Sequence, residues 1–504
     1  MTPRTSTRRR PLATPTREAG PASPARLSIW TFAITSVALF MTTLDNLVVT
    51  TALPVIREDL HAGLSGLEWT VNAYTLTFAV LLITGAALGD RFGRRRMFVT
   101  GISLFTLASA GAALAPSADL LIAARAVQGI GAAIVTPLTL TLLAGAFPPE
   151  KRGIALGVWS GISGVAVAIG PLVGGAVIEL ASWHWIFWIN VPIGIALAPT
   201  AFRKLEESYG PKVPLDLPGL GLASTGLFGL VYGLVRAQTI GWTAPEVLIS
   251  LGAGVVLLAA FVRQELRSEA PMLPMQFFAK RSFAVTNVVS MAMYFGMFGS
   301  IFFLSQFMQN VLGNSPLQAG LKLLVWTGAT MIVAPLAGIF SEKFGPRWFM
   351  VGGVSLQAIA LGWLATEAST TMSYGEMIIP FILAGSGMAL VFAPSASAVL
   401  NSVRVDQAGQ ASGATNAIRE LGGTFGIAVL ATVFSGAGAY TTPQAFVDGL
   451  VPALWVGVAV LAFGALVAAV LPFGGKATAS EVEEYEKDEA ARAERPGPAL
   501  PAAG

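Results

Sequence analysis

Long apolar stretches recur along the whole chain and constrain its fold more than any other feature. A helix needs about 20 apolar residues to cross a bilayer, and fourteen stretches approach or exceed that length. They lie at about residues 28–54, 68–89, 97–115, 119–143, 153–180, 185–202, 216–236, 246–263, 283–311, 317–341, 348–366, 376–400, 410–436 and 450–472. Strands of outer-membrane barrels are short and alternate in hydropathy, unlike these stretches. The sequence therefore predicts an all-α polytopic membrane protein with fourteen transmembrane helices.

The composition narrows the classes of function. Only 12% of the 504 residues are charged, whereas soluble domains carry about 25%. Cysteine is absent and there are two histidines, His61 and His184, which excludes disulfides, thiolate metal sites and a cysteine nucleophile. The sequence contains neither the GxxxxGKS/T motif of nucleotide sites nor the HExxH motif of zinc enzymes. We therefore expect no enzymatic activity, no metal and no cofactor apart from a coupling ion.

The positions of the basic residues predict the orientation in the membrane. If the N-terminus is cytoplasmic, almost all of the 31 Lys and Arg residues lie on the cytoplasmic side. The exceptions are Arg57 and Arg236 outside, and Arg125, Lys322 and Arg419 within spans. Because cytoplasmic loops carry an excess of Lys and Arg, we expect both termini in the cytoplasm and a location in the cell inner (plasma) membrane. The basic N-tail then serves topology, and we expect no nucleic-acid partner.

An internal repeat indicates two related halves. The loop GDRFGRRR (89–96) resembles SEKFGPR (341–347), with an offset of 252 residues that lays Asp90 on Glu342 and Gly93 on Gly345. Parallel repeats that flank a site near the middle of the membrane are typical of transporters. The predicted parts are a disordered basic N-tail (1–27), a six-helix bundle (28–202), a linker with two extra helices (203–282), a second six-helix bundle (283–472) and a cytoplasmic C-tail (473–504).

Five motifs in order resemble those of a known family. They are LDNLVVTTALP (44–54), GDRFGRRR (89–96), ARAVQGIGAA (124–133), AVAIGPLVGG (166–175) and WHWIFWINVPIG (183–194). Over about residues 28–472 the chain resembles the fourteen-span drug:proton antiporter branch of the major facilitator superfamily. Ala86 and Ala166 stand where that branch usually has Gly, and His184 where Arg is common. The resemblance implies the major facilitator fold and export of amphiphilic small molecules in exchange for protons, by alternating access.

Embedded charges are the candidates for proton coupling. Asp45 lies deep in the first span, where a carboxylate is costly and functional by default; the alternative is a salt bridge that only joins helices. Arg125 in the fourth span is the expected cationic partner, since arginine stays charged and must be paired. Arg419 and Glu420 are neighbours in the thirteenth span, so they point about 100° apart. Glu420 is expected to add a second protonatable site or to attract cationic substrates; the alternative is a structural pair.

The repeated loops and a glycine-rich span are candidates for conformational roles. The resemblance implies that the loops latch the two bundles at the cytoplasmic side, and an acid can hold a facing helix N-terminus. We expect Asp90 to face the start of the thirteenth span, although positive-inside topology alone also explains the arginines. The latch candidates are Asp90, Arg91, Gly93, Arg94, Glu342, Gly345 and Arg347. The antiporter motif comprises Gly170, Pro171, Gly174 and Gly175, small residues that allow close helix packing and are expected to limit proton leak.

Polar and aromatic residues inside spans are candidates for a substrate cavity, because such surfaces accept varied apolar ligands. They are Asn46, Asn72, Tyr74, Gln128, Tyr294, Phe298, Gln306, Trp326 and Arg419. The expected partners are a small-molecule substrate (antibiotics, dyes or toxic metabolites), protons and the lipid bilayer, with a monomeric protein. The alternatives are a dedicated exporter of one metabolite or siderophore with the same fold and, more distantly, a membrane receptor or a membrane-embedded enzyme.

Overall fold

The structure is a computed structural model that describes residues 24–147, 162, 165–166, 169–210, 216–268, 271–403 and 408–472. Within these residues every regular element is a helix. The helices are α1 (Pro24–Asp59), α2 (Leu64–Phe92), α3 (Arg94–Ala113), α4 (Ala118–Ala146), α6 (Trp185–Trp188), α7 (Asn190–Lys204), α8 (Leu217–Ile240), α9 (Pro245–Glu265), α10 (Gln276–Ala279), α11 (Arg281–Asn310), α12 (Pro316–Phe344), α13 (Pro346–Glu367), α14 (Tyr374–Asn401), α15 (Ala408–Ala437) and α16 (Pro443–Ala468). The all-α polytopic fold predicted from the sequence is therefore confirmed.

The number of membrane spans in the described residues is compatible with the predicted fourteen but lower. Twelve described helices are long and apolar enough to cross a membrane, and the count is thirteen if the two halves of α2, which is bent by 53° between Leu82 and Thr84, form one span. The predicted span at 153–180 is described as a continuous helix only over Ile169–Leu180. Fourteen spans thus stay a prediction. The N-tail expected to be disordered (1–27) lies outside the described residues except for its last four, which begin α1, and the C-tail (473–504) lies outside them entirely.

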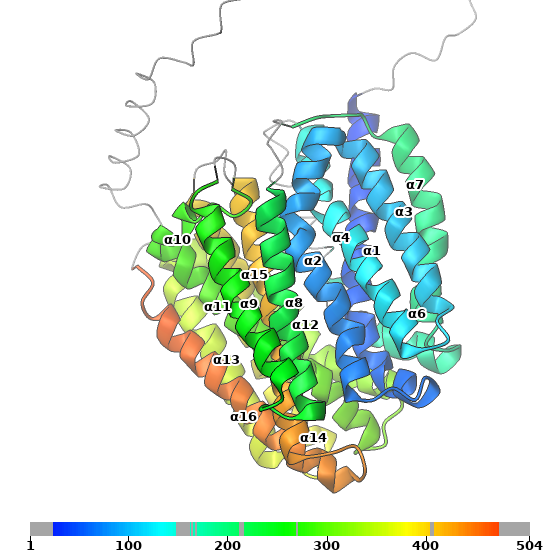
Figure 1. The fold of residues 1–504 in the computed structure, drawn as a ribbon, viewed down its shortest axis with the longest axis vertical. Helices are drawn as coiled ribbons and strands as arrows, with labels where there is room; N and C mark the ends of the chain where they lie inside the picture. Colours follow the sequence, from blue (N-terminus) through cyan, green and yellow to red (C-terminus); the bar gives the residue numbers. More distant parts are fainter. Residues whose placement is uncertain are drawn as a thin grey trace, which may run out of the picture.

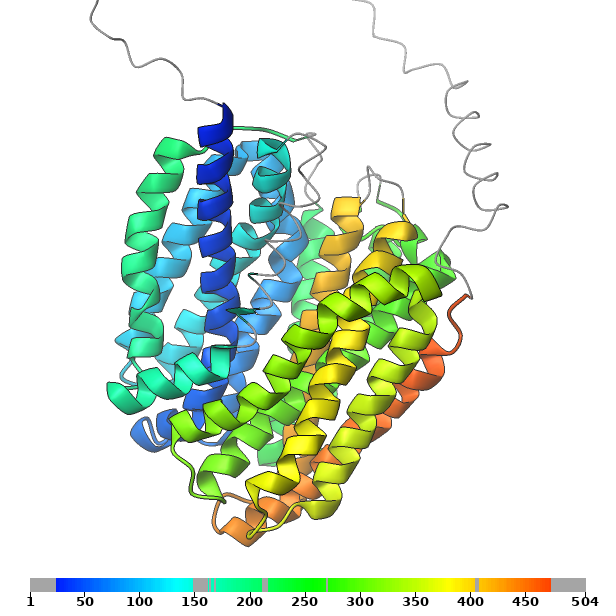
Figure 2. The same ribbon diagram turned by 180° about the vertical axis from the view of Figure 1, so that it is seen from behind.

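The helices gather in two groups that contact each other along the middle of the molecule. Figures 1 and 2 show α1–α4 and α7 on one side, in blue to teal, and α11 and α13–α16 on the other. Contacts between the groups run from α2 to α15 and from α1 to α11 and α12. Helices α8 and α9 pack on each other, and α8 also contacts α2 and α15. Buried Leu76, Leu227, Val231 and Ala428 form the core of that junction.

Two glycines give the repeated loops the same local structure. Gly93, with φ of 103°, separates α2 from α3, and Gly345, with φ of 82°, separates α12 from α13. Residues with a side chain rarely adopt positive φ, so a glycine ends one helix and allows the next to begin at once. The offset of 252 residues therefore relates two equivalent helix–turn–helix junctions.

Candidate functional site

A buried ion pair joins the first and fourth predicted spans. Arg125 Nη1 on α4 lies 2.5 Å from Asp45 Oδ2 on α1, and the two side chains are 0% and 1% exposed. The other carboxylate oxygen, Oδ1, accepts hydrogen bonds from Gln128 Nε2 at 3.2 Å and Asn190 Nδ2 at 2.7 Å. Gln128 reaches the same carboxylate as Arg125 because it lies about one helical turn further along α4. Three helices, α1, α4 and α7, thus converge on one carboxylate.

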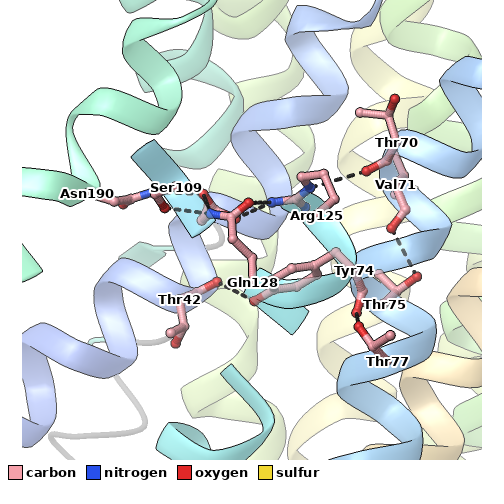
Figure 3. A network of polar contacts seen from close by, with 11 residues as sticks. Thr42, Thr70, Val71, Tyr74, Thr75, Thr77, Ser109, Arg125, Gln128 and Asn190 are labelled. Carbon is pink, nitrogen blue, oxygen red and sulfur yellow. Dashed lines mark hydrogen bonds and ion pairs between the residues drawn. The ribbon is translucent and has the colours of Figure 1, made fainter. Parts of the chain in front are cut away.

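Neutral groups complete the surroundings of the Arg125 guanidinium (Figure 3). Its Nε donates to the Thr70 carbonyl at 3.2 Å, and its Nη1 also donates to Gln128 Oε1 at 3.0 Å. The Tyr74 ring lies 4.3 Å from the guanidinium carbon, and the Tyr74 hydroxyl donates to the Thr42 carbonyl at 3.2 Å. A buried ion pair is retained at low cost only when its remaining donors and acceptors are satisfied. Four of the five polar side-chain atoms of this pair have partners among the described residues, and Arg125 Nη2 is the exception.

The charges of the thirteenth predicted span are arranged differently. Arg419 on α15 is directed toward α14: its Nη2 donates to Ser395 Oγ at 2.6 Å, and the Phe392 ring lies 4.9 Å from its guanidinium carbon. Glu420 is directed toward the other group of helices, where its carboxylate is hydrogen-bonded with Asn46 of α1. The two neighbours therefore face different helices, as the helical geometry requires.

A chain segment outside the motif binds the first repeated loop. Arg94 Nη2 lies 2.7 Å from Asp90 Oδ1 within the loop. The backbone N–H of Arg94 donates to the Ser208 carbonyl at 2.9 Å, and that of Gly210 donates to the Asp90 carbonyl at 3.1 Å. Glu207 Oε1 accepts from the Arg95 N–H at 3.0 Å. The described partners of Asp90 thus lie in its own loop and in the segment after α7. The residues just before α15 fall outside the described part of the chain, so the expected contact of Asp90 there stays a prediction.

The remaining latch candidates have local partners. Arg91 lies over the Phe92 ring, with 5.5 Å from its guanidinium carbon to the ring centre, and Arg347 lies over the Trp348 ring at 5.2 Å. The side chain of Glu342 falls outside the described residues. Gly345 has the positive φ given above. The two loops are therefore alike in backbone, while their described side-chain contacts differ.

The antiporter motif packs against both groups of helices. Gly170 and Gly174 face Leu47 and Val48 of α1. A Cβ atom on Gly175 would lie 2.3 Å from the carbonyl oxygen of Pro316 on α12, and one on Gly320 would lie 2.2 Å from that of Pro171. Because real Cβ atoms do not approach backbone so closely, both positions require glycine. The motif therefore supports a backbone-to-backbone contact between residues 170–175 and α12.

The predicted cavity residues are largely buried, and their place in a substrate cavity stays a prediction. Asn72, Gln128, Gln306 and Trp326 are 0% exposed, and Gln306 accepts a hydrogen bond from the Tyr440 hydroxyl at 2.7 Å. The other aromatic candidates contact rings: Tyr294 lies 5.7 Å from Phe298, and Trp326 lies 5.8 Å from Phe381. Two small pockets lie next to the embedded charges. One is lined in part by Asp45 and Asn190, the other in part by Asn416 and Arg419.

Sequence reasoning missed three residues of these sites. Asn190 and Ser109 are buried polar residues in apolar spans, and Gln128 Nε2 donates to Ser109 Oγ at 2.6 Å. Asn190 and Ser109 could have been found from the sequence, because each is a polar residue within an apolar stretch. Glu207 had no such signal, because an acid in a charged loop is ordinary. Only the fold brings it to Arg95 and Arg96, whose Nε atoms lie 3.6 and 3.7 Å from Glu207 Oε2.

Comparisons with known proteins agree with this architecture. The family model described as Major Facilitator Superfamily matches residues 35–427 and again 286–499. The chain is 34% identical over 436 residues to the tetracenomycin C resistance and export protein of Streptomyces glaucescens, which covers 86% of this chain and 81% of that protein. It is 36% identical to the cephamycin export protein of Amycolatopsis lactamdurans, over 88% of this chain and 92% of the other. A puromycin resistance protein of Streptomyces alboniger is 34% identical, with 91% and 93% covered.

The fold itself recurs in solved structures of transporters. A D-xylose-proton symporter superposes with a TM-score of 0.63 at 15% sequence identity, over 89% of this chain and 99% of that one. A POT family transporter gives a TM-score of 0.64 at 14% identity, over 86% and 94%. At such low identity the likeness concerns the fold alone. Together with the match of the family model over most of the sequence, it leads to one conclusion: this chain belongs to the Major Facilitator Superfamily.

Proposed function

We propose that this protein is a secondary active transporter that exports amphiphilic small molecules, such as antibiotics, in exchange for protons. Its curated relatives carry names of antibiotic resistance and export proteins. The observation that supports proton exchange best is the Asp45–Arg125 pair, because a carboxylate buried in a membrane-spanning helix can gain and lose a proton. Neither an enzymatic activity nor a cofactor is part of this proposal.

The coupling step follows from the geometry of the pair. Protonation of Asp45 would neutralise one partner and weaken its bonds with Arg125 and Asn190, so the proton and the substrate would favour different states of one site. Release of the proton would restore the pair. Each charge that crosses the membrane potential supplies about 2.3 kcal/mol per 100 mV, and each unit of pH gradient adds about 1.4 kcal/mol. One proton can therefore sustain a substrate gradient of one to three orders of magnitude.

The two helix bundles, the repeated loops and the antiporter motif would support this proton-coupled step. We assign residues 28–202 and 283–472 to two six-helix bundles that rock about the site, with α8 and α9 inserted between them in sequence. The loops around Asp90 and Gly345 would latch one conformation, and the packing of Gly175 against α12 would limit proton leak. Glu420 would be a second site that exchanges protons. The protein would lie as a monomer in the cell inner membrane with both termini cytoplasmic, and reporter fusions at the two ends would contradict this if they lay on opposite sides.

A dedicated exporter of one compound is the second candidate. The relatives named above are called after single compounds, namely tetracenomycin C, cephamycin and puromycin. A resistance and accumulation panel of unrelated antibiotics and dyes in an efflux-deficient host distinguishes a broad exporter from a dedicated one. Proteoliposomes with an imposed pH gradient test the exchange itself. Transport of a compound that the panel identifies should stop when the proton gradient is collapsed, and transport that continues uphill would contradict proton coupling.

A further inference from the structure

Arg419 is a buried cation that interacts electrostatically with its sequence neighbour Glu420 but forms no ion pair with it. The residue is 6% exposed and lies within the membrane-spanning part of α15. None of the ion pairs formed among the described residues includes it. The side chain of Glu420 is directed to Asn46 instead. A charged group held away from water is costly unless it is paired, so an arginine without an ion pair in this position calls for a function.

The groups around Arg419 leave part of its hydrogen-bonding capacity unused. Its Nη2 and Nη1 donate to the neutral oxygens of Ser395 and Asn416, at 2.6 and 3.4 Å. Its Nε is buried and has no hydrogen-bond partner, and the same holds for the hydroxyl of Thr415, which is 3% exposed. Arginine presents its donors in a planar fork that fits a carboxylate. Both residues line the same pocket, so two unsatisfied polar groups, one of them on the cation itself, lie close together.

A pocket opens next to these groups. It lies between α14 and α15, and its lining consists of small or neutral residues and the arginine: Ala396, Val399, Ser412, Thr415, Asn416 and Arg419. The lining contains no acid, so nothing in it repels an anion. The pocket is small, so it suits a head group and not a whole amphiphile. The aromatic rings of Phe392 and Tyr294 flank the guanidinium, at 4.9 and 6.0 Å from its central carbon.

We propose that this pocket is an anion subsite in which Arg419 binds a carboxylate of the exported molecule. The inference rests on the proposed export function and adds the chemical class of the substrate: amphiphiles with an acidic head group and an apolar body. Arg125 is unsuited to this role because Asp45 already neutralises it. Proton binding and substrate binding would then use different residues: the proton would bind Asp45, the partner of Arg125, and the substrate would bind Arg419.

Binding of a matched pair of probes to the purified full-length protein tests the proposal. The probes are 2-naphthoate and 2-naphthamide, which share the same rings and differ in the charge of the head group. Hydrogen bonds to a charged partner are the stronger kind, so wild-type protein should bind naphthoate about tenfold or more tighter than naphthamide. Arg419→Gln should abolish that preference, whereas Arg419→Lys, which keeps the charge, should retain part of it.

The controls separate this proposal from protein damage and from the proposed function. Arg236→Gln removes an exposed arginine of α8 that is paired with Glu246, and this variant should keep the full preference for naphthoate. Unchanged naphthamide binding reports that a variant is folded. Equal binding of the two probes by wild-type protein, or an undiminished preference in Arg419→Gln, would overturn the subsite. The binding experiment uses no proton gradient, so it does not depend on proton coupling. A failure of proton coupling in proteoliposomes would therefore leave the subsite standing, and a failure of the subsite would leave proton coupling standing.

Discussion

The two arginines buried in the middle of this protein differ in one respect. Arg125 and Arg419 both lie beside aromatic rings and both donate to neutral oxygens. Only Arg125 has an ion-pair partner among the described residues, and that partner, Asp45, comes from a different helix. Glu420, directly adjacent to Arg419 in sequence, contacts α1 instead. The comparison teaches that pairing inside a helical bundle follows the facing surfaces of helices and not the separation along the chain.

The largest expected effect comes from the acid of the paired site. Asp45→Asn keeps the shape of the side chain but removes the charge that a proton would neutralise, so transport driven by a pH gradient should fall to the level of empty proteoliposomes. Exchange driven by a substrate gradient should survive. Asp59→Asn, the same change at the exposed end of α1, is the matched control. Uphill transport at the wild-type rate by Asp45→Asn would move the coupling role to Glu420.

The next largest effect is expected in the free energy of unfolding, which substitutions of Arg125 and Arg419 should lower by different amounts. Arg125→Met leaves the Asp45 carboxylate buried without its cation, and breaking a buried pair in this way costs about 3–5 kcal/mol. Arg419→Met loses charged hydrogen bonds to Ser395 and Asn416, worth about 1.5–3 kcal/mol each. It also removes a buried charge that has no ion pair, which offsets part of that loss, so the net loss should be smaller than for Arg125→Met. Denaturant unfolding in detergent measures both. Equal losses of stability for the two variants would contradict the absence of an ion-pair partner for Arg419. The double variant Asp45→Asn/Arg125→Met, which removes both charges, should recover part of the stability that Arg125→Met loses.

Glu420 should have a smaller effect on transport than Asp45. The Glu420→Gln variant keeps a group that can hydrogen-bond with Asn46, while the proton-binding carboxylate of Asp45 is untouched. We expect uphill transport to drop several-fold and to remain dependent on the pH gradient. The readout is the initial rate in proteoliposomes at several gradients. Complete loss of coupling would show that the two acids act as one unit, and no change would leave Glu420 a structural contact.

The smallest effect is expected at the loop far from both arginines. Asp90 and Arg94 are partly exposed, at 27% and 21% for their side chains, and such pairs contribute about 0.2–1 kcal/mol. Asp90→Asn should therefore lower the turnover rate by about two- to fivefold with unchanged substrate binding. Gly93→Leu should do the same or more, because its φ is positive. A variant that transports normally but binds substrate poorly would place this loop in the binding site.

The sequence alone determined the architecture. Long apolar stretches can cross a membrane only as helices, because every backbone polar group must be satisfied internally there. The same logic identified Asp45, Arg125, Arg419 and Glu420, since a charge inside such a stretch is too costly to be incidental. Gly93 and Gly345 were detectable because a repeated glycine between helices indicates a turn that other residues resist.

The tertiary structure decided which of these residues meet. Side-chain partners depend on how helices rotate about their axes and on where loops return, and neither follows from hydropathy. The fold brings Asn190 to Asp45 across 145 positions, directs the Glu420 carboxylate to Asn46 without an ion pair to Arg419, and places Glu207 against the loop of Asp90 and Arg95. The sequence alone shows that each buried charge is energetically costly. Which groups offset that cost depends on the helix surfaces that pack around the charge.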